Sequence, residues 1–405
     1  MRLFQSHPFH DISLVRGHEC TVWDADGNAY TDMLSGVWCS ILGHSHPRLV
    51  ACVGEQVSKI AHVGVGFGSQ EVEDAMSALS QILPAELNRV LFLNTGSEAV
   101  ELGLKLARAA TARDGIVVMQ NGYYGATNYA LSLSEAGRGA PYLTEPDGII
   151  RLPFPDCSCC AYGKSTPCDE FCCVHSVEEH IRKTRARVAA VMYEPALGAG
   201  ILVPPPGYAT RLRRLASSLD ALLIAEEVTT GMGRLGCWFG FMQDGVVPDI
   251  LVVGKAIGAG LPVAAVITTD QIETLCKAVN LRHVQSHQND PYSARIASTV
   301  ISVIREECLL TRVDEIGRRL TTGLRLIAER VPHVREVRGK GAMIGIKLHE
   351  STPNLGSRIW SRLLEAGFIT DLHAATGTIR LFPPYVLSEA EIDRFLDAFS
   401  AALRA

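Results

Sequence analysis

The sequence of 405 residues has little of what marks membrane, secreted and fibrous proteins. No apolar run approaches the roughly 18 residues that a membrane-spanning helix needs, and the N-terminus contains no apolar core of a secretory signal. Internal repeats and Gly/Ser-rich or Pro-rich tracts are also absent. We therefore expect a globular protein of the cytoplasm that does not associate with a membrane.

A dense block of positive charge is also missing. The chain has 38 Lys and Arg against 43 Asp and Glu, for a formal net charge of −5. Nucleic-acid binding depends on clustered cations that neutralise phosphates, so we expect no nucleic-acid partner. Hydrophobic residues make up 47% and charged residues 20%, a balance typical of folded domains, and the length predicts two or three folding units.

Short apolar runs alternate with amphipathic, helix-like segments through the middle of the chain. The amphipathic segments include residues 98–110 and 208–219. This alternation predicts an α/β fold in which helices cover both faces of a mostly parallel central sheet. The runs that we interpret as buried strands are residues 90–93, 116–119, 188–193, 222–225, 250–253 and 263–267.

The pattern changes after residue 290. A long helical segment starts at 293 and continues to 331, and a capping box of Ser388 and Glu391 opens the final helix. Shorter strand-like and helical segments lie between them, as expected of a smaller α+β domain. We expect residues 1–45 to form an N-terminal segment that packs with the small domain, 46–290 to form the large domain, and 291–405 to form the small domain.

A turn rich in small residues comes after the first predicted strand of the large domain. It contains Gly96 and Ser97 and leads directly into a helix. Glycine lets the backbone approach a ligand closely, and the free N–H groups of a first helical turn attract phosphate. The alternative is an ordinary turn with no ligand.

Two further strand ends carry charged residues. Glu226 and Glu227 come after the run at 222–225, where a carboxylate without solvent needs a cation or a donor. The alternative, a solvated strand end, suits Glu227 better than Glu226. Lys255, one of eight lysines, comes after an apolar run and a glycine. A desolvated lysine has a lowered pKa and becomes a nucleophile that can form a Schiff base, unless it simply extends into solvent.

These three strand ends converge at one edge of a parallel sheet, where ligands bind. They offer a phosphate site, an acid for a ring nitrogen and an amine for an aldehyde. Pyridoxal 5′-phosphate needs those three contacts, so we expect it as the cofactor.

The order and spacing of the residues resemble class III pyridoxal-phosphate aminotransferases. The similarity spans nearly the whole chain, and its longest block runs from 223 to 236. The segments that carry it are LGHSHP at 42–47, TGSEA at 95–99, LIAEEVTTGMGRLG at 223–236, GKAIGAGLP at 254–262 and RLFPP at 380–384. The resemblance implies the fold of type I pyridoxal-phosphate enzymes.

The resemblance also assigns cofactor contacts. Lys255 corresponds to the Schiff-base lysine and proton shuttle, and Glu226 corresponds to the acid at the ring nitrogen. Ser286 corresponds to a hydroxyl residue that reaches the phosphate from the neighbouring subunit, which implies a homodimer with sites completed in trans. The remaining cofactor contacts are Gly96 and Ser97 at the phosphate, Tyr123 on one ring face, Val228 on the other, and Thr229 beside the 3′-oxygen.

For the substrate, the resemblance implies that Arg380 binds a carboxylate as a bidentate pair. Glu194 corresponds to an acid that pairs with this arginine in some members. The segment with Trp38 and Cys39 is expected to line the pocket. The alternatives are a core or interface tryptophan and a buried structural thiol.

The sequence departs from the family pattern near the cofactor. Glu226 replaces the usual Asp, Tyr124 replaces a His after the stacking aromatic, and Thr229 replaces a frequent Gln. These changes are compatible with cofactor binding, but they make the substrate hard to infer by analogy.

One segment is unusually rich in cysteine. Its spacing, C-x-C-C and then C-x3-C-C, is not the regular C-x2-C of common zinc sites, so a metal and uncoordinated cysteines in a surface loop both remain open. The cysteines are Cys157, Cys159, Cys160, Cys168, Cys172 and Cys173.

The leading hypothesis is an aminotransferase that moves an amino group from a small-molecule donor such as glutamate to a keto or aldehyde acceptor through Lys255. The first alternative is an epimerase, racemase or decarboxylase on the same scaffold, for which Tyr124 or Cys39 would supply a second acid or base. The second is a cofactor-binding regulator without turnover, which the lack of a basic arm and the presence of Lys255 disfavour.

Overall fold

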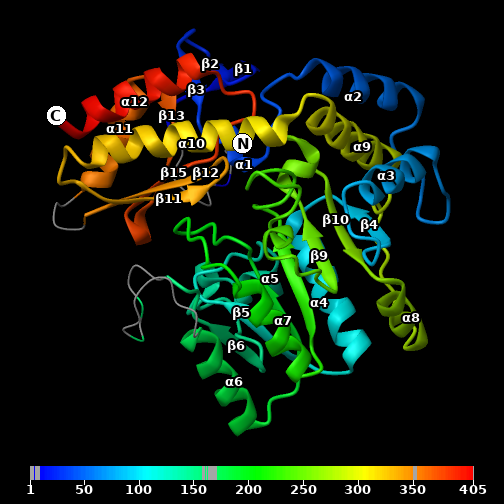
Figure 1. Ribbon diagram of the computed structural model, residues 1–405. Helices are drawn as coiled ribbons and strands as arrows, with labels where there is room; N and C mark the ends of the chain where they lie inside the picture. Colours follow the sequence, from blue (N-terminus) through cyan, green and yellow to red (C-terminus); the bar gives the residue numbers. More distant parts are fainter. Residues whose placement is uncertain are drawn as a thin grey trace.

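The computed structural model describes residues 4, 10–156, 160, 162, 171–349 and 354–404. Within this part of the chain the largest sheet has seven strands in the order β4-β10-β9-β8-β7-β5-β6 (Figure 1). The strands run parallel except β10, which is antiparallel to β4 and β9. Their bounds are β4 Arg89–Leu93, β5 Gly115–Met119, β6 Ile149–Leu152, β7 Val188–Tyr193, β8 Leu222–Glu227, β9 Ile250–Val253 and β10 Ala264–Thr268.

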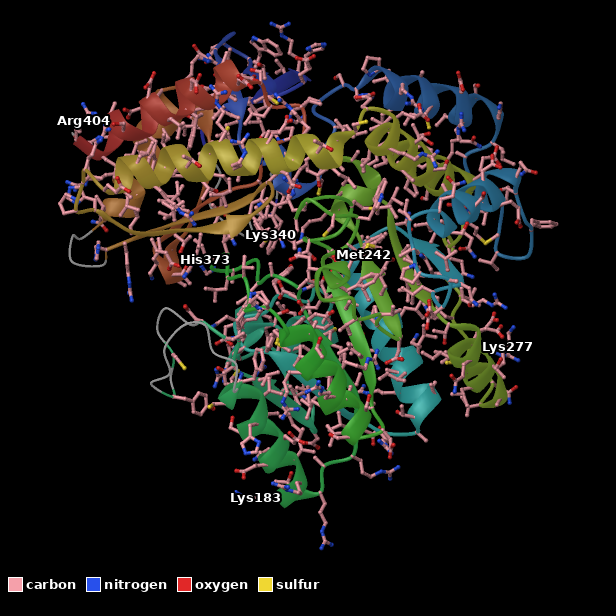
Figure 2. The ribbon with its side chains drawn as sticks, in the orientation of Figure 1. Lys183, Met242, Lys277, Lys340, His373 and Arg404 are labelled. Atoms are coloured by element: carbon pink, nitrogen blue, oxygen red, sulfur yellow. The ribbon has the colours of Figure 1, made fainter. Side chains whose placement is uncertain are left out.

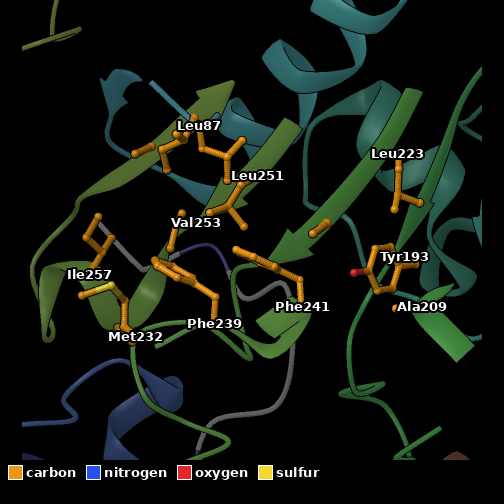
Figure 3. Packing of buried hydrophobic residues seen from close by; sticks show 14 of the residues in the cluster. Leu87, Tyr193, Ala209, Leu223, Met232, Phe239, Phe241, Leu251, Val253 and Ile257 are labelled. Carbon is orange, nitrogen blue, oxygen red and sulfur yellow. The ribbon is translucent and has the colours of Figure 1, made fainter. Parts of the chain in front are cut away.

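Helices cover both faces of this sheet, which confirms the predicted α/β fold. Successive strand residues point to opposite faces, so Leu251 and Val253 join one apolar cluster while Ile250 and Val252 join another. Figure 3 shows Phe239 and Phe241 packed beside Val253 in the first cluster. The helices of this region are α2 Pro47–Lys59, α3 Gln70–Ser80, α4 Gly96–Thr111, α5 Asn128–Leu133, α6 Cys172–Thr184, α7 Tyr208–Ser218, α8 Asp270–Ala278 and α9 Pro291–Glu306.

The C-terminal part forms another sheet, which is antiparallel, has the order β11-β12-β15-β14 and packs against helices. These elements are β11 Val334–Lys340, β12 Met343–Leu348, β14 Asp371–His373, β15 Thr378–Leu381, α10 Leu309–Ala328, α11 Leu355–Glu365 and α12 Glu389–Arg404. The predicted capping box is confirmed, since the Glu391 amide donates to Ser388 Oγ at 3.2 Å and the Ser388 amide donates back to Glu391 at 2.8 Å.

The N-terminal strands lie against this second domain (Figure 1). They are β1 Leu14–His18, β2 Thr21–Asp24 and β3 Ala29–Asp32. β3 pairs in parallel with β13 Phe368–Ile369, and Met33 joins the apolar cluster of the C-terminal helices.

The long helix predicted from 293 to 331 is wrong as a single element. The structure has two helices, α9 and α10, separated at Cys308, whose φ of 53° ends a right-handed helix. α9 packs against α2 and α3 of the large domain, whereas α10 packs against β11 and α12. We therefore propose that the domain division lies near residue 307 rather than at 290.

The two domains meet through both apolar and polar contacts, and one apolar cluster joins Ile201 and Leu235 of the large domain to Met343 and Phe382 of the small domain. Lys340 at the end of β11 donates to Gln243 of the large domain at 2.6 Å. Figure 2 shows Lys340 near Met242, whereas Lys183 and Lys277 lie far from this boundary. In the described part of the chain no helix is long and apolar enough to span a membrane.

Candidate active site

Lys255 lies directly after β9 and opens the short 3₁₀-helix η4 Lys255–Gly258. Its φ of 44° is unusual for a residue with a side chain, and such strain is common at functional sites. Nζ donates to Thr229 Oγ1 at 2.9 Å and lies 4.8 Å from the centre of the Trp38 ring. The structure thus brings together three residues that the sequence predicted separately.

The pKa of Lys255 is lowered, because burial disfavours the charged amine and Arg380 adds repulsion. Glu226, Cys39 and Glu194 act in the opposite direction and favour the charged form. Burial and Arg380 thus favour the neutral, nucleophilic form of the amine, whereas the three acidic groups favour its protonated form.

Glu226 and Glu227 are the last two residues of β8, and both are buried, with 3% and 0% exposure. The pKa of Glu226 is raised well above its usual value, mainly by burial and then by Glu194, while Lys255 opposes this shift. A positive group beside Glu226 would stabilise its charged form.

The interpretation of Glu227 as a solvated strand end is wrong. Its carboxylate accepts from the amides of Gly240 and Phe241 at 2.6 and 2.8 Å and from Thr230 Oγ1 at 2.9 Å. Glu227 therefore anchors η3 Gly240–Asp244, the segment that places Phe241 in the core.

Gly96 and Ser97 form the first turn of α4, which has a capping box of Thr95 and Glu98. A Cβ on Gly96 would lie 2.9 Å from Val228, and one on Gly254 would lie 3.1 Å from the same side chain. The two glycines and Val228 thus form a close-packed cradle, in which a side chain at position 96 would force Val228 to move and one at position 254 would be tight. Glycine here leaves backbone N–H groups open to an anion.

Tyr123 lies beside this turn. Its amide donates to Glu194 Oε1 at 3.3 Å, and the amide of Ala126, three residues on, donates to Ser97 Oγ at 3.0 Å. The Tyr123 side chain is 52% exposed, so its ring face is free to cover a ligand. Ser286 is exposed and forms no hydrogen bond to the residues that the structure describes.

Trp38 ends the short, irregular helix α1 Ser35–Trp38, Cys39 follows it, and Asp32 organises this segment. Asp32 accepts from the amides of Leu34 and Gly36 at 2.8 and 2.7 Å, and Trp38 has a φ of 65°. The Trp38 ring stacks on Phe382 at 4.3 Å between ring centres. Burial raises the pKa of the Cys39 thiol, which donates to the carbonyl of Val37 at 3.1 Å.

The predicted pairing of Glu194 with Arg380 is wrong in this structure. Glu194 accepts from the Gly198 amide at 3.1 Å, and burial raises its pKa to about 7. Arg380 pairs instead with Asp371, and it also donates to the Gly198 carbonyl at 3.0 Å. Sequence analysis missed Asp371 because it lies on a three-residue strand that carries no clear apolar pattern.

The guanidinium of Arg380 lies on the same ring as the lysine amine. Its Cζ is 4.8 Å from the centre of Trp38, the distance that also separates Lys255 Nζ from that ring. Tyr124, by contrast, is a core residue, because its hydroxyl accepts from the Met119 amide at 2.8 Å and is fully buried. The site therefore presents an amine and a guanidinium against one aromatic wall.

Half of the cysteine-rich segment's six cysteines lie outside the residues that the structure describes. Of the six, only Cys160, Cys172 and Cys173 are described, so the structure does not test the predicted alternatives of a metal site and uncoordinated cysteines. Elsewhere in the described chain, His62, His287 and Asp290 bring three possible metal ligands together. Each histidine Nδ1 lies 2.6 Å from one Asp290 oxygen. These are hydrogen-bond distances, which are shorter than the spacing of about 3.3 Å between ligands of a tetrahedral zinc ion.

Comparisons with known proteins agree with this geometry. A family model for class III aminotransferases matches residues 4–403. An uncharacterized aminotransferase of Schizosaccharomyces pombe is 33% identical, over 96% of this chain and 90% of that protein. The acetylornithine aminotransferase of Methanopyrus kandleri is 31% identical, over 97% and 95%. An amine transaminase from an uncultivated Pseudomonas species, solved with pyridoxal phosphate bound, superposes with a TM-score of 0.94 at 28% identity, over 100% and 98%.

Proposed function

The chain belongs to the class III aminotransferases, which confirms the family, fold and cofactor expected from its sequence, and on that premise we propose how its residues divide the reaction. The enzyme transfers amino groups between small molecules with pyridoxal phosphate. The observation that carries the assignment of residues is the convergence of Lys255, Glu226 and the Gly96 turn at the carboxyl ends of three strands.

The residues present fit the cofactor. The cradle of Gly96, Gly254 and Val228 leaves little room for a Cβ, and glycine at the first turn of α4 leaves backbone amides open to a phosphate. The buried Glu226 carboxylate suits a protonated ring nitrogen, and the Lys255 amine suits an aldehyde. When bound, pyridoxal phosphate supplies an aldehyde that accepts the amino group and a ring that delocalises the electron pair left on the donor Cα.

Lys255 is proposed to move the proton. Its Nζ takes the proton from the donor Cα and returns it on the cofactor side, and the bond to Thr229 Oγ1 keeps Nζ against Trp38. Glu226 holds a proton at the ring nitrogen through its charge. Tyr123 and Val228 are proposed as the residues that would hold the two faces of the cofactor ring.

Arg380 is proposed to bind a substrate carboxylate, with Trp38 as the wall that sets its distance from Lys255. Glutamate is the donor that this arrangement suits best, and a keto acid or an aldehyde is the acceptor. Glu194 is proposed to act through Gly198, because it accepts from the Gly198 amide while the Gly198 carbonyl accepts from Arg380. We also expect the enzyme to act in the cytoplasm.

A homodimer is proposed to complete each site, with Ser286 reaching the phosphate bound by its partner subunit. Ser286 is exposed in this chain, and nearby Val284 is 72% exposed. Large apolar side chains are also bare elsewhere, with Phe67 at 77% and Val37 at 70%. We propose that the partner subunit covers some of these exposed apolar side chains.

The epimerase or racemase alternative needs a second acid opposite Lys255, for which Tyr124 and Cys39 are the candidates. Tyr124 is not available for this role. The Tyr124 hydroxyl is bound to the backbone of Met119 and lies in the core. No observation favours that alternative over amino transfer.

The test is a half-reaction. Cofactor-loaded protein mixed with L-glutamate in the absence of any acceptor should change from the pyridoxal to the pyridoxamine absorbance. Exchange of the Cα hydrogen in heavy water without this change would instead support an epimerase. No response to any of a panel of amino acids and simple amines would contradict the proposed function.

A further inference from the structure

The guanidinium of Arg380 already holds a carboxylate before any substrate arrives. Nε donates to Asp371 Oδ2 at 2.6 Å, and Nη2 pairs with the same oxygen. Nη1 donates to the carbonyl oxygens of Gly198 and Ala199 at 3.0 and 3.4 Å. To bind a second carboxylate through two hydrogen bonds, Arg380 needs two parallel N–H donors on one edge of its guanidinium. Asp371 or the two backbone carbonyls must therefore leave one edge.

Asp371 is the partner that can leave most easily. It sits opposite Arg380 in the antiparallel pairing of β14 and β15, and both side chains therefore stand on the same face. β14 is a three-residue strand at the edge of its sheet. Its Asp371 side chain is 29% exposed against 12% for Arg380, so a rotation of Asp371 into water leaves the backbone pairing in place.

The other partners of Arg380 are fixed. Gly198 is held by Glu194 through its amide, and the guanidinium Cζ lies over the Trp38 ring, 4.8 Å from its centre. Burial lowers the pKa of Arg380, and Asp371 is the charged neighbour that offsets this burial. A buried cation that loses its only counter-charge is costly unless another anion takes its place.

We propose that Asp371 competes with the substrate carboxylate for Arg380, and thereby sets how strongly the enzyme prefers carboxylate-bearing substrates over amines that lack a carboxylate. The proposal rests on the proposed function, because it takes Arg380 as the carboxylate site. A substrate carboxylate replaces Asp371 on the guanidinium and sends it into solvent. An amine without a carboxylate leaves the Asp371–Arg380 pair intact, so its binding leaves no unpaired charge.

The test measures binding of glutarate, an unreactive dicarboxylate, to the cofactor-loaded enzyme by calorimetry. Asp371→Asn keeps the size and one acceptor oxygen but removes the competing charge, and Asp371→Ala removes both. Glu336→Gln is the matched control, because Glu336 pairs with Arg338 at 3.2 Å in the same sheet and its substitution removes the same charge. Arg380→Ala reports whether glutarate uses this arginine.

We expect glutarate to bind about fivefold more tightly to both Asp371 variants, with wild-type affinity in Glu336→Gln and no binding in Arg380→Ala. KM for L-glutamate should fall in parallel, while KM for benzylamine stays within about twofold. Unchanged or weaker glutarate binding in both Asp371 variants would overturn the proposal, as would equal changes in the two KM values. If either result is found and the wild-type enzyme still converts its cofactor to the pyridoxamine form with L-glutamate, only this proposal has failed. The absence of any amino transfer from either donor would mark the failure of the proposed function itself.

Discussion

At the scale of single residues, the chemistry depends on the surroundings of each charged group. Burial and Arg380 lower the pKa of Lys255, which favours the nucleophilic amine that we propose for it, while the carboxylates of Glu226 and Glu194 favour its protonated form. A lowered pKa suits the proposed role, because a group that accepts and returns a proton works best when its pKa lies closer to the working pH. A lysine on the open surface would remain protonated at neutral pH.

Glu226 is predicted to act through its charge. Glu226→Gln should slow the glutamate half-reaction about 100-fold, because a neutral amide no longer holds a proton on the ring nitrogen. Glu226→Asp should stay within about tenfold of wild type, since the charge remains. Stopped-flow absorbance in a single turnover measures both rates. A Gln variant as fast as wild type would remove Glu226 from the mechanism.

At the scale of secondary-structure elements, Glu227 shows how one buried acid holds a segment. Its pKa is raised from 4.5 to about 7 in the folded protein, chiefly by burial. Between these values the folded protein keeps a proton that the unfolded chain has lost. The free energy of unfolding contributed by this group is therefore greatest below about pH 4.5, and it falls as the pH rises to about 7.

Glu227→Gln should remove this pH dependence and also cost stability, because one amide oxygen cannot replace the acceptors used by Gly240, Phe241 and Thr230. We expect the variant to be about 1–3 kcal/mol less stable near pH 5, with a smaller difference at pH 8. Urea unfolding at the two values measures this, with Glu336→Gln as a control. A difference that grows with pH would contradict the raised pKa.

The elements that carry the cofactor residues could be predicted because buried parallel strands are continuous apolar runs. Lys255 and Glu226 could be located because each stands at the end of such a run, and β7 and β9 have the predicted bounds. Asp371 could not be found in this way. Its pairing with Arg380 depends on the register of a three-residue edge strand, and sequence periodicity says nothing about so short an element.

At the scale of the whole molecule, the arrangement of helices decides which domain a segment joins. The amphipathic pattern of residues 293–331 predicted one helix, because the turn at Cys308 has no glycine or proline to mark it. Tertiary packing separates α9 from α10 and leaves α9 on the large domain. The pairing of β3 with β13 joins residues more than 300 positions apart, a contact that local patterns do not predict.

Completion of the sites in trans predicts complementation between two inactive variants. Lys255→Ala lacks the amine, and Ser286→Glu places a negative charge next to the phosphate. When the two are unfolded, mixed equally and refolded with cofactor, half of the dimers are hybrids with one intact site. We expect about a quarter of wild-type activity from the mixture. No recovery, in a mixture shown to be dimeric, would place Ser286 outside the partner's site.

The most direct measurement of the central claim is chemical capture of the cofactor on its lysine. Borohydride reduction of the cofactor-loaded protein, and then peptide mass spectrometry, should find the pyridoxyl group on Lys255 and on none of the other seven lysines. Covalent capture at another lysine, or cofactor that binds in stoichiometric amount without any reducible link to Lys255, would contradict the account.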